Sequence, residues 1–488
     1  HTESLTPIFQ TDAVYGLNTD QVSSFTSLTG TATASDSSFV VSTGTSSTAQ
    51  GVISGRKRLR YRGGQGVVGR FTALFTTPVT YSYQVAGFGH AEDGVYFAMR
   101  EATGNGYSGV APAFGILYVN RALREVRTLT VSTGATSASN CTITLNSVAF
   151  TVPLTAASNI QRTVYEIAMF GAYTGWDAYP ASSTTVVFVR KAAAATAGTY
   201  SFAAGTTGAA ATIALTRAGA AGTETFIPQS TWNGDRMDGT AGENNPSGVT
   251  LVPTFGNVFQ IGIQYLGYGS ISFQIEVVPA DANNADFVTV HTLKLPNTLT
   301  KTSFGNPSFP FTMAAYSAGS TTDLTVKVGS FAGFIEGMKK LHGTRFSYYA
   351  QSTAGNSSTY VPLFTLMNGR YYKGMVNQAI INIISMNAAM KSSNSPGVFY
   401  IIRSGVLVGN PSFTQYATNS VSWVDTASTG ITFATNDQIV WSGHLAETGN
   451  MDHQFDGGLE DFTIQPGEWM SLAFKSLSGN VSFITGSI

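Results

Sequence analysis

Charged residues are scarce in this sequence. Asp, Glu, Lys and Arg make up 11% of its 488 residues and the formal net charge is -1, whereas a typical soluble domain is about 25% charged. A general nucleic-acid binder is basic, so we expect no nucleic-acid partner. Solubility rests instead on Gly, Ser, Thr, Asn and Gln. Neutral polar surfaces of this kind suit faces that stay covered, or contacts with other neutral surfaces such as sugars.

Cysteines and long apolar runs are also lacking. Cys141 is the single cysteine, which excludes an internal disulfide framework and a thiolate metal cluster. It lies in an alternating stretch, so we expect a buried structural thiol. No stretch approaches the ~18 uninterrupted apolar residues of a membrane span, so no membrane insertion is expected. The opening HTESLTP has no initiator Met, basic segment or apolar segment, so no signal peptide is visible and a processed N-terminus fits.

Alternation of polar and apolar residues dominates what is present. Nearly every segment has period 2 and is interrupted by Gly, Asn-Gly or Pro, which predicts a mainly β, multi-domain protein built from β-sandwiches and a jelly roll. The clearest case is NVFQIGIQYLGYGSISFQIEV, residues 257–277. Two alternating runs flank a Gly-rich turn there, which predicts a β-hairpin with one buried face.

The other face of this hairpin is almost uncharged. It carries neutral polar side chains and a single Glu, and one tyrosine lies between two glycines at the tip. Neutral hydrogen-bonding groups avoid the cost of desolvating charge. We therefore expect a glycan or a neighbouring subunit to contact five residues: Gln260, Gln264, Tyr268, Ser272 and Gln274.

The chain is expected to have four parts. Residues 1–50, rich in Ser, Thr and Gly with little apolar content, are predicted to form an N-terminal arm. Residues 51–126 and 219–340 should form one β-sandwich, interrupted by a small inserted α+β module over 127–218. Residues 341–488 should form a C-terminal jelly-roll sandwich.

One amphipathic helix is predicted, inside the inserted module. The stretch TAASNIQRTVYEIAMF places apolar residues at i, i+4, i+7 and i+8, beginning at Ile160, which is the pattern of a helix with one buried face. We expect it near 158–170, with Ser158 or Asn159 as its N-cap. No other long helix is expected.

Several stretches resemble viral structural proteins. The run TLTVSTGATSAS…TITLNSVAFTV, the helix, and GWDAYP…TTVVFVRKAAAATAGTYSF together resemble a module common in phage tail and sheath proteins. The stretches GQGVVGRFTALF, STWNGDRMDG, PSGVTLVPTFGNVFQI and GSFAGFIEG resemble structural proteins of tailed phages and large DNA viruses that have a lectin-like outer domain. The C-terminal part resembles fibre-type jelly rolls in general character.

This resemblance implies a virion structural protein. It favours a surface fibre, spike or decoration component on the outer surface of the particle, active in assembly and in attachment to host glycans. Its partners would be further copies of itself and other virion proteins, and the low charge together with the jelly roll favours a trimer. Two alternatives stay open: a minor capsid or tail shell protein with no receptor role, and an extracellular glycan-active enzyme.

Catalytic signatures are lacking. The sequence has no GxSxG, no GxxxxGK[ST] and no HExxH motif, and we expect no enzymatic activity, no cofactor and no metal. Asp235 and Asp238 lie in a Gly-flanked turn, which favours a structural role over a calcium loop or a carboxylate pair. HLAETGNMDHQFDGGLED brings His444 and His453 near acidic residues, but without a fixed histidine spacing a polar loop is favoured over a metal site.

Overall fold

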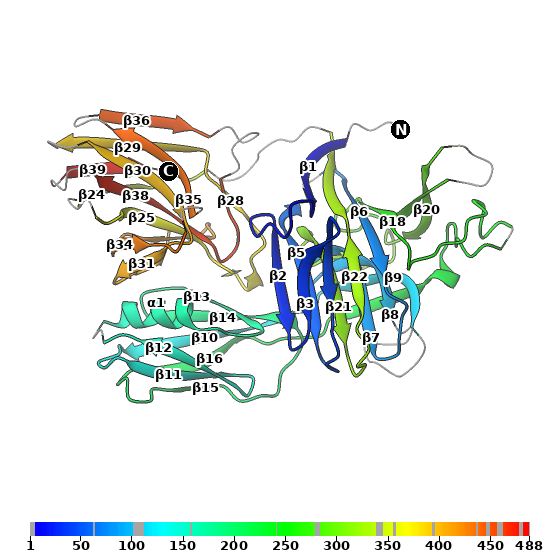
Figure 1. Ribbon diagram of the computed structural model, residues 1–488, viewed down its shortest axis with the longest axis horizontal. Coiled ribbons are helices and arrows are strands. Elements are labelled where there is room, and N and C mark those ends of the chain that lie inside the picture. The colour runs from blue at the N-terminus through cyan, green and yellow to red at the C-terminus, as the bar shows by residue number, and fades with distance from the viewer. Residues whose placement is uncertain are drawn as a thin grey trace. The chain divides into compact units, whose positions relative to one another are not determined.

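The fold is mainly β, as predicted. Its antiparallel strands are accompanied by one α-helix and one 3-10 helix, η1 (Gln229–Thr231), among the residues described. The chain divides into two compact units (Figure 1): unit 1 is His1–Leu123 with Ala221–His342, and unit 2 is Arg124–Ala220 with Gly343–Ile488. The computed structural model describes residues 5–487 apart from 62–63, 101–111, 157–158, 241, 279–283, 338–344, 355–357, 393–395, 436–437, 446–448, 456–461 and 478–481.

Unit 1 is a sandwich of two antiparallel sheets. The strands of the first sheet are β1 (Leu5–Asp12), β3 (Thr31–Ser35), β4 (Ser38–Ser42), β6 (Val67–Phe75), β18 (Asn257–Ile263), β19 (Ile271–Val277), β20 (Asp286–Leu293), β22 (Thr325–Val328) and β23 (Ser330–Glu336). This nine-stranded sheet has the order β20-β19-β18-β6-β22-β4-β3, and β23 joins β1 to β6. The strands of the second sheet are β2 (Val22–Ser27), β5 (Gln50–Leu59), β7 (Ser82–Gly89), β8 (Gly94–Arg100), β9 (Ala113–Asn120), β17 (Thr223–Pro228) and β21 (Phe309–Ser317). This seven-stranded sheet has the order β17-β9-β8-β7-β21-β5-β2.

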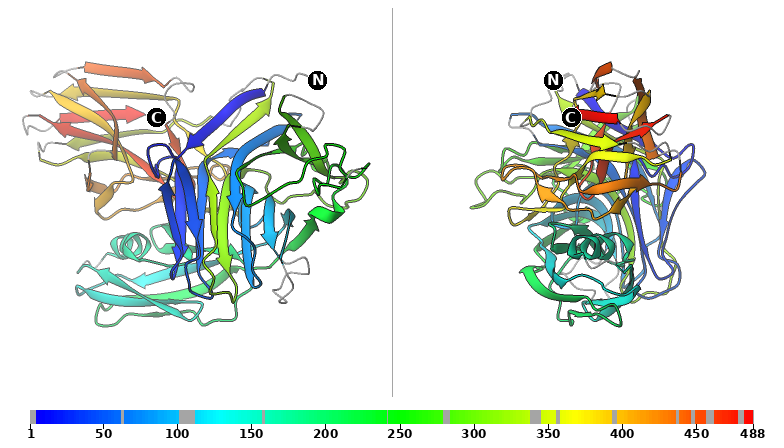
Figure 2. Two further views of the ribbon diagram at one scale, coloured as in Figure 1. Left: turned by 45° about the vertical axis from the view of Figure 1, so that its right-hand side comes forward. Right: turned by 90° about the vertical axis from the view of Figure 1, so that its left-hand side faces the viewer.

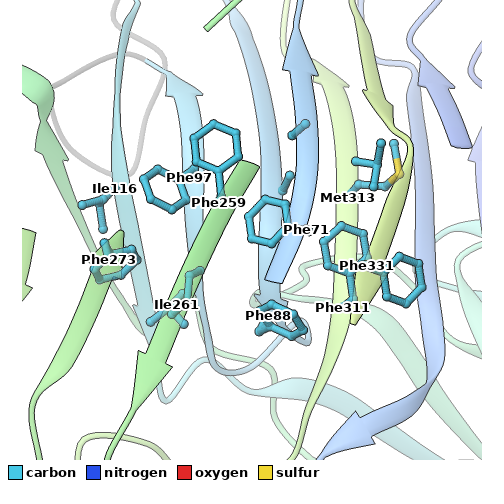
Figure 3. Close-up of a cluster of buried hydrophobic side chains, with 14 of the residues drawn as sticks. Phe71, Phe88, Phe97, Ile116, Phe259, Ile261, Phe273, Phe311, Met313 and Phe331 are labelled. Carbon is cyan, nitrogen blue, oxygen red and sulfur yellow. The ribbon is translucent and has the colours of Figure 1, made fainter. Parts of the chain in front are cut away.

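Phenylalanine rings fill the space between these two sheets (Figure 3). Phe71 of β6 lies beside Phe259 of β18, with ring centroids 5.5 Å apart. Phe71 also meets Phe88 and Phe311 of the opposite sheet, at 5.9 and 5.3 Å. Burying each such ring contributes roughly 1.5–3 kcal/mol, so the alternating inward residues hold the two sheets together.

The hairpin expected at residues 257–277 is confirmed. β18 and β19 pair antiparallel, with Gln260 opposite Gln274 and Gly262 opposite Ser272. The inward residues of both strands belong to the core of unit 1. The turn uses positive φ at Leu266 (35°) and Gly267 (85°), so one of its two left-handed positions is taken by the residue that adopts this conformation most readily.

The expectation of an N-terminal arm is wrong. Residues 5–42 form β1, β2, β3 and β4. Of these, β1 pairs with β23, β2 with β5 and β4 with β22, all of which lie outside this stretch. Their few apolar residues stand at inward positions, so Val22, Phe39 and Val41 are buried in the core. A strand needs only one apolar face, and a low apolar content therefore does not exclude it.

The inserted module forms two small sheets and the helix. Its strands are β10 (Arg124–Thr133), β11 (Ser139–Leu145), β12 (Val148–Leu154), β13 (Trp176–Pro180), β14 (Thr185–Ala193), β15 (Ser201–Ala203) and β16 (Ala210–Arg217). The sheets have the orders β13-β14-β10-β16 and β12-β11-β15. Helix α1 (Ile160–Phe170) packs against β12 of one sheet and β13 and β14 of the other (Figure 2). Asn159 is an N-cap as expected, because its side chain accepts the N–H of Gln161 at 2.7 Å, and Ser158 lies outside the described residues.

The C-terminal part is a jelly roll. Its larger sheets contain β24 (Tyr349–Ala354), β25 (Val361–Asn368), β29 (Ser385–Ser392), β30 (Gly397–Arg403), β32 (Thr414–Gln415), β33 (Ser422–Asp425), β35 (Ile439–Leu445), β36 (Gly449–Gln454), β38 (Trp469–Ser476) and β39 (Ser482–Ser487). The four-stranded sheet has the order β24-β39-β29-β36 and the six-stranded sheet β32-β33-β25-β38-β30-β35. The chain crosses between them at β24–β25, β29–β30, β35–β36 and β38–β39, as in a jelly roll. Short ribbons β26 (Tyr371–Tyr372) with β27 (Met375–Val376), β28 (Ile381–Asn382) with β37 (Thr463–Ile464), and β31 (Val406–Gly409) with β34 (Ser428–Thr432) complete it.

The module packs against this jelly roll inside unit 2. One apolar cluster contains Val126, Tyr165 and Tyr179 of the module together with Ile402 and Leu407 of the jelly roll. The Tyr165 hydroxyl accepts the N–H of Leu407 at 2.8 Å. The two parts, expected as separate domains, therefore form one compact unit.

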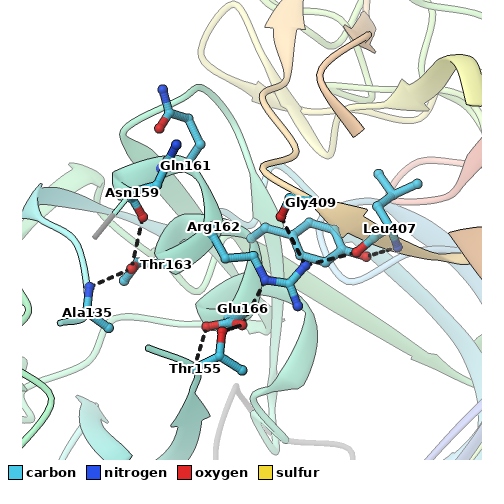
Figure 4. A network of polar contacts seen from close by, with 10 residues as sticks. Ala135, Thr155, Asn159, Gln161, Arg162, Thr163, Glu166, Leu407 and Gly409 are labelled. Atoms are coloured by element: carbon cyan, nitrogen blue, oxygen red, sulfur yellow. Dashed lines mark hydrogen bonds and ion pairs between the residues drawn. The ribbon is translucent and has the colours of Figure 1, made fainter. Parts of the chain in front are cut away.

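A polar network crosses the same contact (Figure 4). Arg162 Nη1 donates to the carbonyl oxygen of Leu407 at 3.0 Å, and Arg162 Nε pairs with the buried Glu166 at 2.8 Å. At another point Arg370 pairs with Asp177 at 3.2 Å. Directional bonds thus fix how the module sits on the jelly roll.

Candidate binding face

A row of polar side chains crosses the outer face of the nine-stranded sheet. The strand register places Arg70 of β6, Gln260 of β18, Gln274 of β19 and Thr289 of β20 opposite one another. Arg70 Nε donates to Gln260 Oε1 at 2.5 Å. Gln260 Nε2 donates to Gln274 Oε1, and Gln274 Nε2 donates to Thr289 Oγ1 at 3.2 Å. We call these four residues the polar row.

The row is held in place by the strands beneath it. Residues on either side of each member, such as Phe71, Ile261 and Phe273, point into the core. Because side chains alternate between the faces of a strand, the row members must point outward. Their amides and guanidinium bond to one another, so their orientations are set before any partner arrives.

Two aromatic rings flank the cation of the row. The guanidinium carbon of Arg70 lies 4.9 Å from the ring centroid of Phe287 on β20 and 5.4 Å from that of Phe334 on β23. Both rings are partly exposed. Such cation–π contacts restrict the guanidinium, and the rings also offer apolar area at the edge of an otherwise polar face.

The predicted site residues divide into two groups. Gln260 and Gln274 meet in the polar row, and Ser272 lies on the same face one step along, opposite Gly262. Gln264 lies past the end of β18, and Tyr268 is at the hairpin turn, where it is exposed as expected. The structure thus joins three of the five predicted residues on one face and leaves two at the hairpin end.

Sequence reasoning missed four residues of this face: Arg70, Thr289, Phe287 and Phe334. One feature of the sequence could have pointed to Arg70, because it is the single charged residue in the strand VVGRFTALF. Its position opposite Gln260 depends on pairing between β6 and β18, which lie far apart in the sequence. No local pattern identifies that neighbour.

The outer face of the seven-stranded sheet is chemically different. It holds a buried apolar cluster that includes Val85, Tyr96 and Leu117. Burial raises the pKa of Tyr316 on this face to about 12. Arg100 there is paired with Glu224 at 2.5 Å. The region around this cluster therefore lacks the open polar row of the nine-stranded sheet.

The carboxylates of the NGDRMDG turn organise their own loop. Asp235 is buried and accepts the N–H groups of Met237 and Ser247 at 2.9 and 2.8 Å. Asp238 accepts the backbone N–H of Thr240 at 2.9 Å, and hydrogen bonds from Thr240 lower the pKa of Asp238. The structural role expected for Asp235 is confirmed. Asn233 of the same turn bonds to β20, where its side chain both donates to and accepts from the backbone of Thr292.

Metal ligands do not gather in the described part of the chain, where no group of three or more His, Cys, Asp or Glu residues could hold an ion. His453 lies against the rings of Trp441 and Phe455, with centroids 5.4 and 4.7 Å away. Residues 456–461 of the same acidic segment lie outside the described residues. Among the residues placed by the structure, no helix is long and apolar enough to cross a bilayer.

Two shallow hollows occur elsewhere. One, of about 380 Å³ in unit 1, is lined by Phe114, Gln229, Asp238 and neighbouring residues. The other, of about 200 Å³, lies on the four-stranded sheet of the jelly roll, where Tyr349 and Asn387 are among its lining residues. Neither contains a pair of acidic side chains.

Comparisons with known proteins found only distant similarity. No family model matches the chain, and no curated protein matches it. A legume lectin-like domain from Entamoeba histolytica is 7% identical with a TM-score of 0.24, covering 64% of this chain and 89% of that one. The lectin UEA-II in complex with galactose is 8% identical with a TM-score of 0.23, and lectin II from Ulex europaeus is 9% identical with a TM-score of 0.21; each match covers 68% of this chain and 100% of the lectin. Scores this low carry no argument about function.

Proposed function

We propose that this protein is a non-catalytic structural component of a virion surface, a fibre, spike or decoration protein, which assembles as a homo-oligomer and attaches to host glycans through the polar row. The observation that carries the glycan contact is the ladder of hydrogen bonds from Arg70 through Gln260 and Gln274 to Thr289. It lies on a partly exposed sheet face beside two aromatic rings.

The chemistry of this face suits a sugar. Amide and hydroxyl groups exchange hydrogen bonds with sugar hydroxyls at a lower desolvation cost than charged groups. Because the row is already ordered, binding loses little side-chain freedom. Phe287 and Phe334 supply apolar area for the C–H faces of a sugar ring.

The virion assignment rests on the resemblance of residues 50–340 to viral structural proteins and on the scarcity of charge. An uncharged surface is suited to permanent contact with other subunits. Other virion proteins would be further partners.

The location of the oligomer contact follows from which side chains of the jelly roll are buried and which are exposed. Three large apolar residues of the jelly roll, Ile402, Trp423 and Trp469, pack in or against the cluster shared with the module. Ile402 is fully buried there, and Trp423 and Trp469 are partly buried. The four-stranded sheet carries exposed side chains on its outer face, among them Tyr349, Asn387 and Asn450, and we assign the trimer contact to that face.

The carboxylates of the NGDRMDG turn already accept hydrogen bonds from their own loop, which supports a lack of catalysis. Asp235 is buried and occupied by backbone N–H groups, whereas glycoside hydrolysis needs two carboxylates facing each other across a cleft. Purified protein should therefore bind host polysaccharide without releasing oligosaccharides. Release that disappears in Asp235→Asn or Asp238→Asn would overturn this part.

A glycan array tests the attachment role. The wild-type protein should bind a defined set of glycans, and the variant Gln260→Ala/Gln274→Ala should lose that binding. The matched control is Asn140→Ala, which removes an exposed amide on β11 of the inserted module and should bind as wild type does. Binding that survives loss of both row amides would move the site elsewhere, and electron microscopy that places the chain inside the particle would refute the surface assignment.

A further inference from the structure

We propose that the polar row selects glycans that carry a carboxylate, with the guanidinium of Arg70 binding that group. This inference rests on the proposed glycan contact and names the class of sugar it takes. It is carried by the state of Arg70, a cation fixed on the sheet face with its terminal nitrogens uncommitted.

The bonds of Arg70 use only one of its nitrogens. Nε donates to Gln260, and the two flanking rings hold the plane of the guanidinium. Within the described residues Nη1 and Nη2 donate to no partner, yet neither is buried. Two parallel N–H donors from one guanidinium match the two oxygens of a carboxylate.

The neighbouring acids do not neutralise Arg70. Glu276 lies on β19 with the same outward parity as Gln274, but among the described residues no Asp or Glu forms an ion pair with Arg70. By contrast Arg100, Arg127 and Arg162 each have a carboxylate at 2.5–2.8 Å. A partly buried arginine without a counter-ion is a preformed site for an anion.

The rest of the row limits what that anion can be. Gln260, Gln274 and Thr289 extend from Arg70 across three further strands, a span of about 14 Å at the usual strand spacing. These groups are neutral donors and acceptors, which suits hydroxyls and not further charges. One charge at one end and a neutral remainder fits an acidic sugar whose carboxylate meets Arg70 while its hydroxyls meet the amides.

The test compares each acidic glycan with its own methyl ester. The probes are sialyllactose, a glucuronate disaccharide and an oligogalacturonate, each measured beside its ester and a neutral counterpart by calorimetry. At least one acid should bind about tenfold or more tightly than its ester, as expected for a charge-assisted bidentate contact. Because the comparison alters the ligand, it decides the matter even if a variant fails to fold.

Variants locate the effect on Arg70. Arg70→Gln should remove the difference between acid and ester, and Arg70→Lys should keep only part of it because lysine lacks the planar fork. The control is Lys327→Gln, which removes a cation from the outer face of the same sheet; Lys327 on β22 pairs with Leu74, four residues along β6 from Arg70.

The outcomes distinguish a failure of the carboxylate site from a failure of the proposed glycan contact. Equal binding of acid and ester, with binding still lost in Gln260→Ala/Gln274→Ala, would refute the carboxylate site and leave the glycan contact standing. No binding of any glycan would refute both. A lower oligomer mass in Arg70→Gln would show that Arg70 meets an acidic residue of a second copy, which also overturns the inference.

Discussion

Replacing Arg162 by leucine tests two roles of this side chain: its ion pair inside the inserted module and its hydrogen bond to the jelly roll. Arg162 Nε lies 2.8 Å from Glu166 Oε1, and the side chains are 16% and 0% exposed. Glu166 also accepts the N–H of Thr155 at 2.9 Å. In Arg162→Leu the Glu166 carboxylate would stay buried without its counter-ion, and the bond to the Leu407 carbonyl would be lost.

The magnitude follows from this burial. Removing one partner of a buried ion pair costs about 3–5 kcal/mol, whereas replacing both partners by apolar residues is often close to neutral. Arg162→Leu should therefore lower the stability of unit 2 by about 3 kcal/mol or more. The double variant Arg162→Leu/Glu166→Leu should cost less than Arg162→Leu alone, because no uncompensated charge remains and the exposed Thr155 can bond to water.

Hydrogen exchange read peptide by peptide measures this cost separately in each unit. Peptides of α1 and of β31 should lose protection in Arg162→Leu and regain part of it in the double variant, while peptides of β18 and β19 in unit 1 should not change. The reasoning is refuted if Arg162→Leu costs less than about 1 kcal/mol, or if the cost of the double variant equals the sum of the costs of Arg162→Leu and Glu166→Leu measured alone.

Three further changes should have defined outcomes. Val164 is buried inside α1, so Val164→Pro should cost ~3 kcal/mol or more and unfold the module. Circular dichroism and limited proteolysis should then show that unit 1 remains folded, and unfolding of unit 1 as well would contradict the prediction. Ile402→Asp places a charge in the shared apolar cluster, so it should prevent folding of unit 2 before it affects assembly. Ile384 is half exposed, so Ile384→Asp should be tolerated. Soluble yield and melting temperature should fall in Ile402→Asp and stay close to wild type in Ile384→Asp, and a normal melting temperature in Ile402→Asp would contradict the prediction. Burial raises the pKa of the Cys141 thiol to about 11, so the native protein should resist alkylation at pH 8. The thiol of the unfolded chain ionises near pH 8.5, so the free energy of unfolding should fall as the pH rises from about 8.5 toward 11. Rapid alkylation of the native protein would contradict the burial of this thiol.

Local pattern was sufficient to predict the hairpin and the helix. The strands at 257–263 and 271–277 follow from uninterrupted period-2 alternation around a Gly turn. The helix at Ile160–Phe170 follows from a 3.6-residue period and the Asn159 cap. Both signals depend only on neighbouring residues, so no tertiary information was needed.

The other features depend on pairing between segments that are far apart in the sequence, so no local pattern predicts them. The strands within residues 5–42 pair with partners such as β22 and β23 about 300 residues away, and their Ser/Thr-rich outer faces resemble a loose arm. The cover over Ile402 comes from the module, more than 180 residues earlier in the chain. The polar row joins three segments of the sequence through the register of four strands, so half of it could be predicted and Arg70 could not.

The most direct test of the central claim is the affinity of a glycan identified on the array for wild type and for Gln260→Ala/Gln274→Ala. These amides form the middle of the polar row, and their removal leaves the core beneath unchanged. We predict a loss of about tenfold or more in affinity, with an unchanged melting temperature and oligomer mass. Equal affinity of the two proteins for that glycan would contradict the assignment of this face as the attachment site.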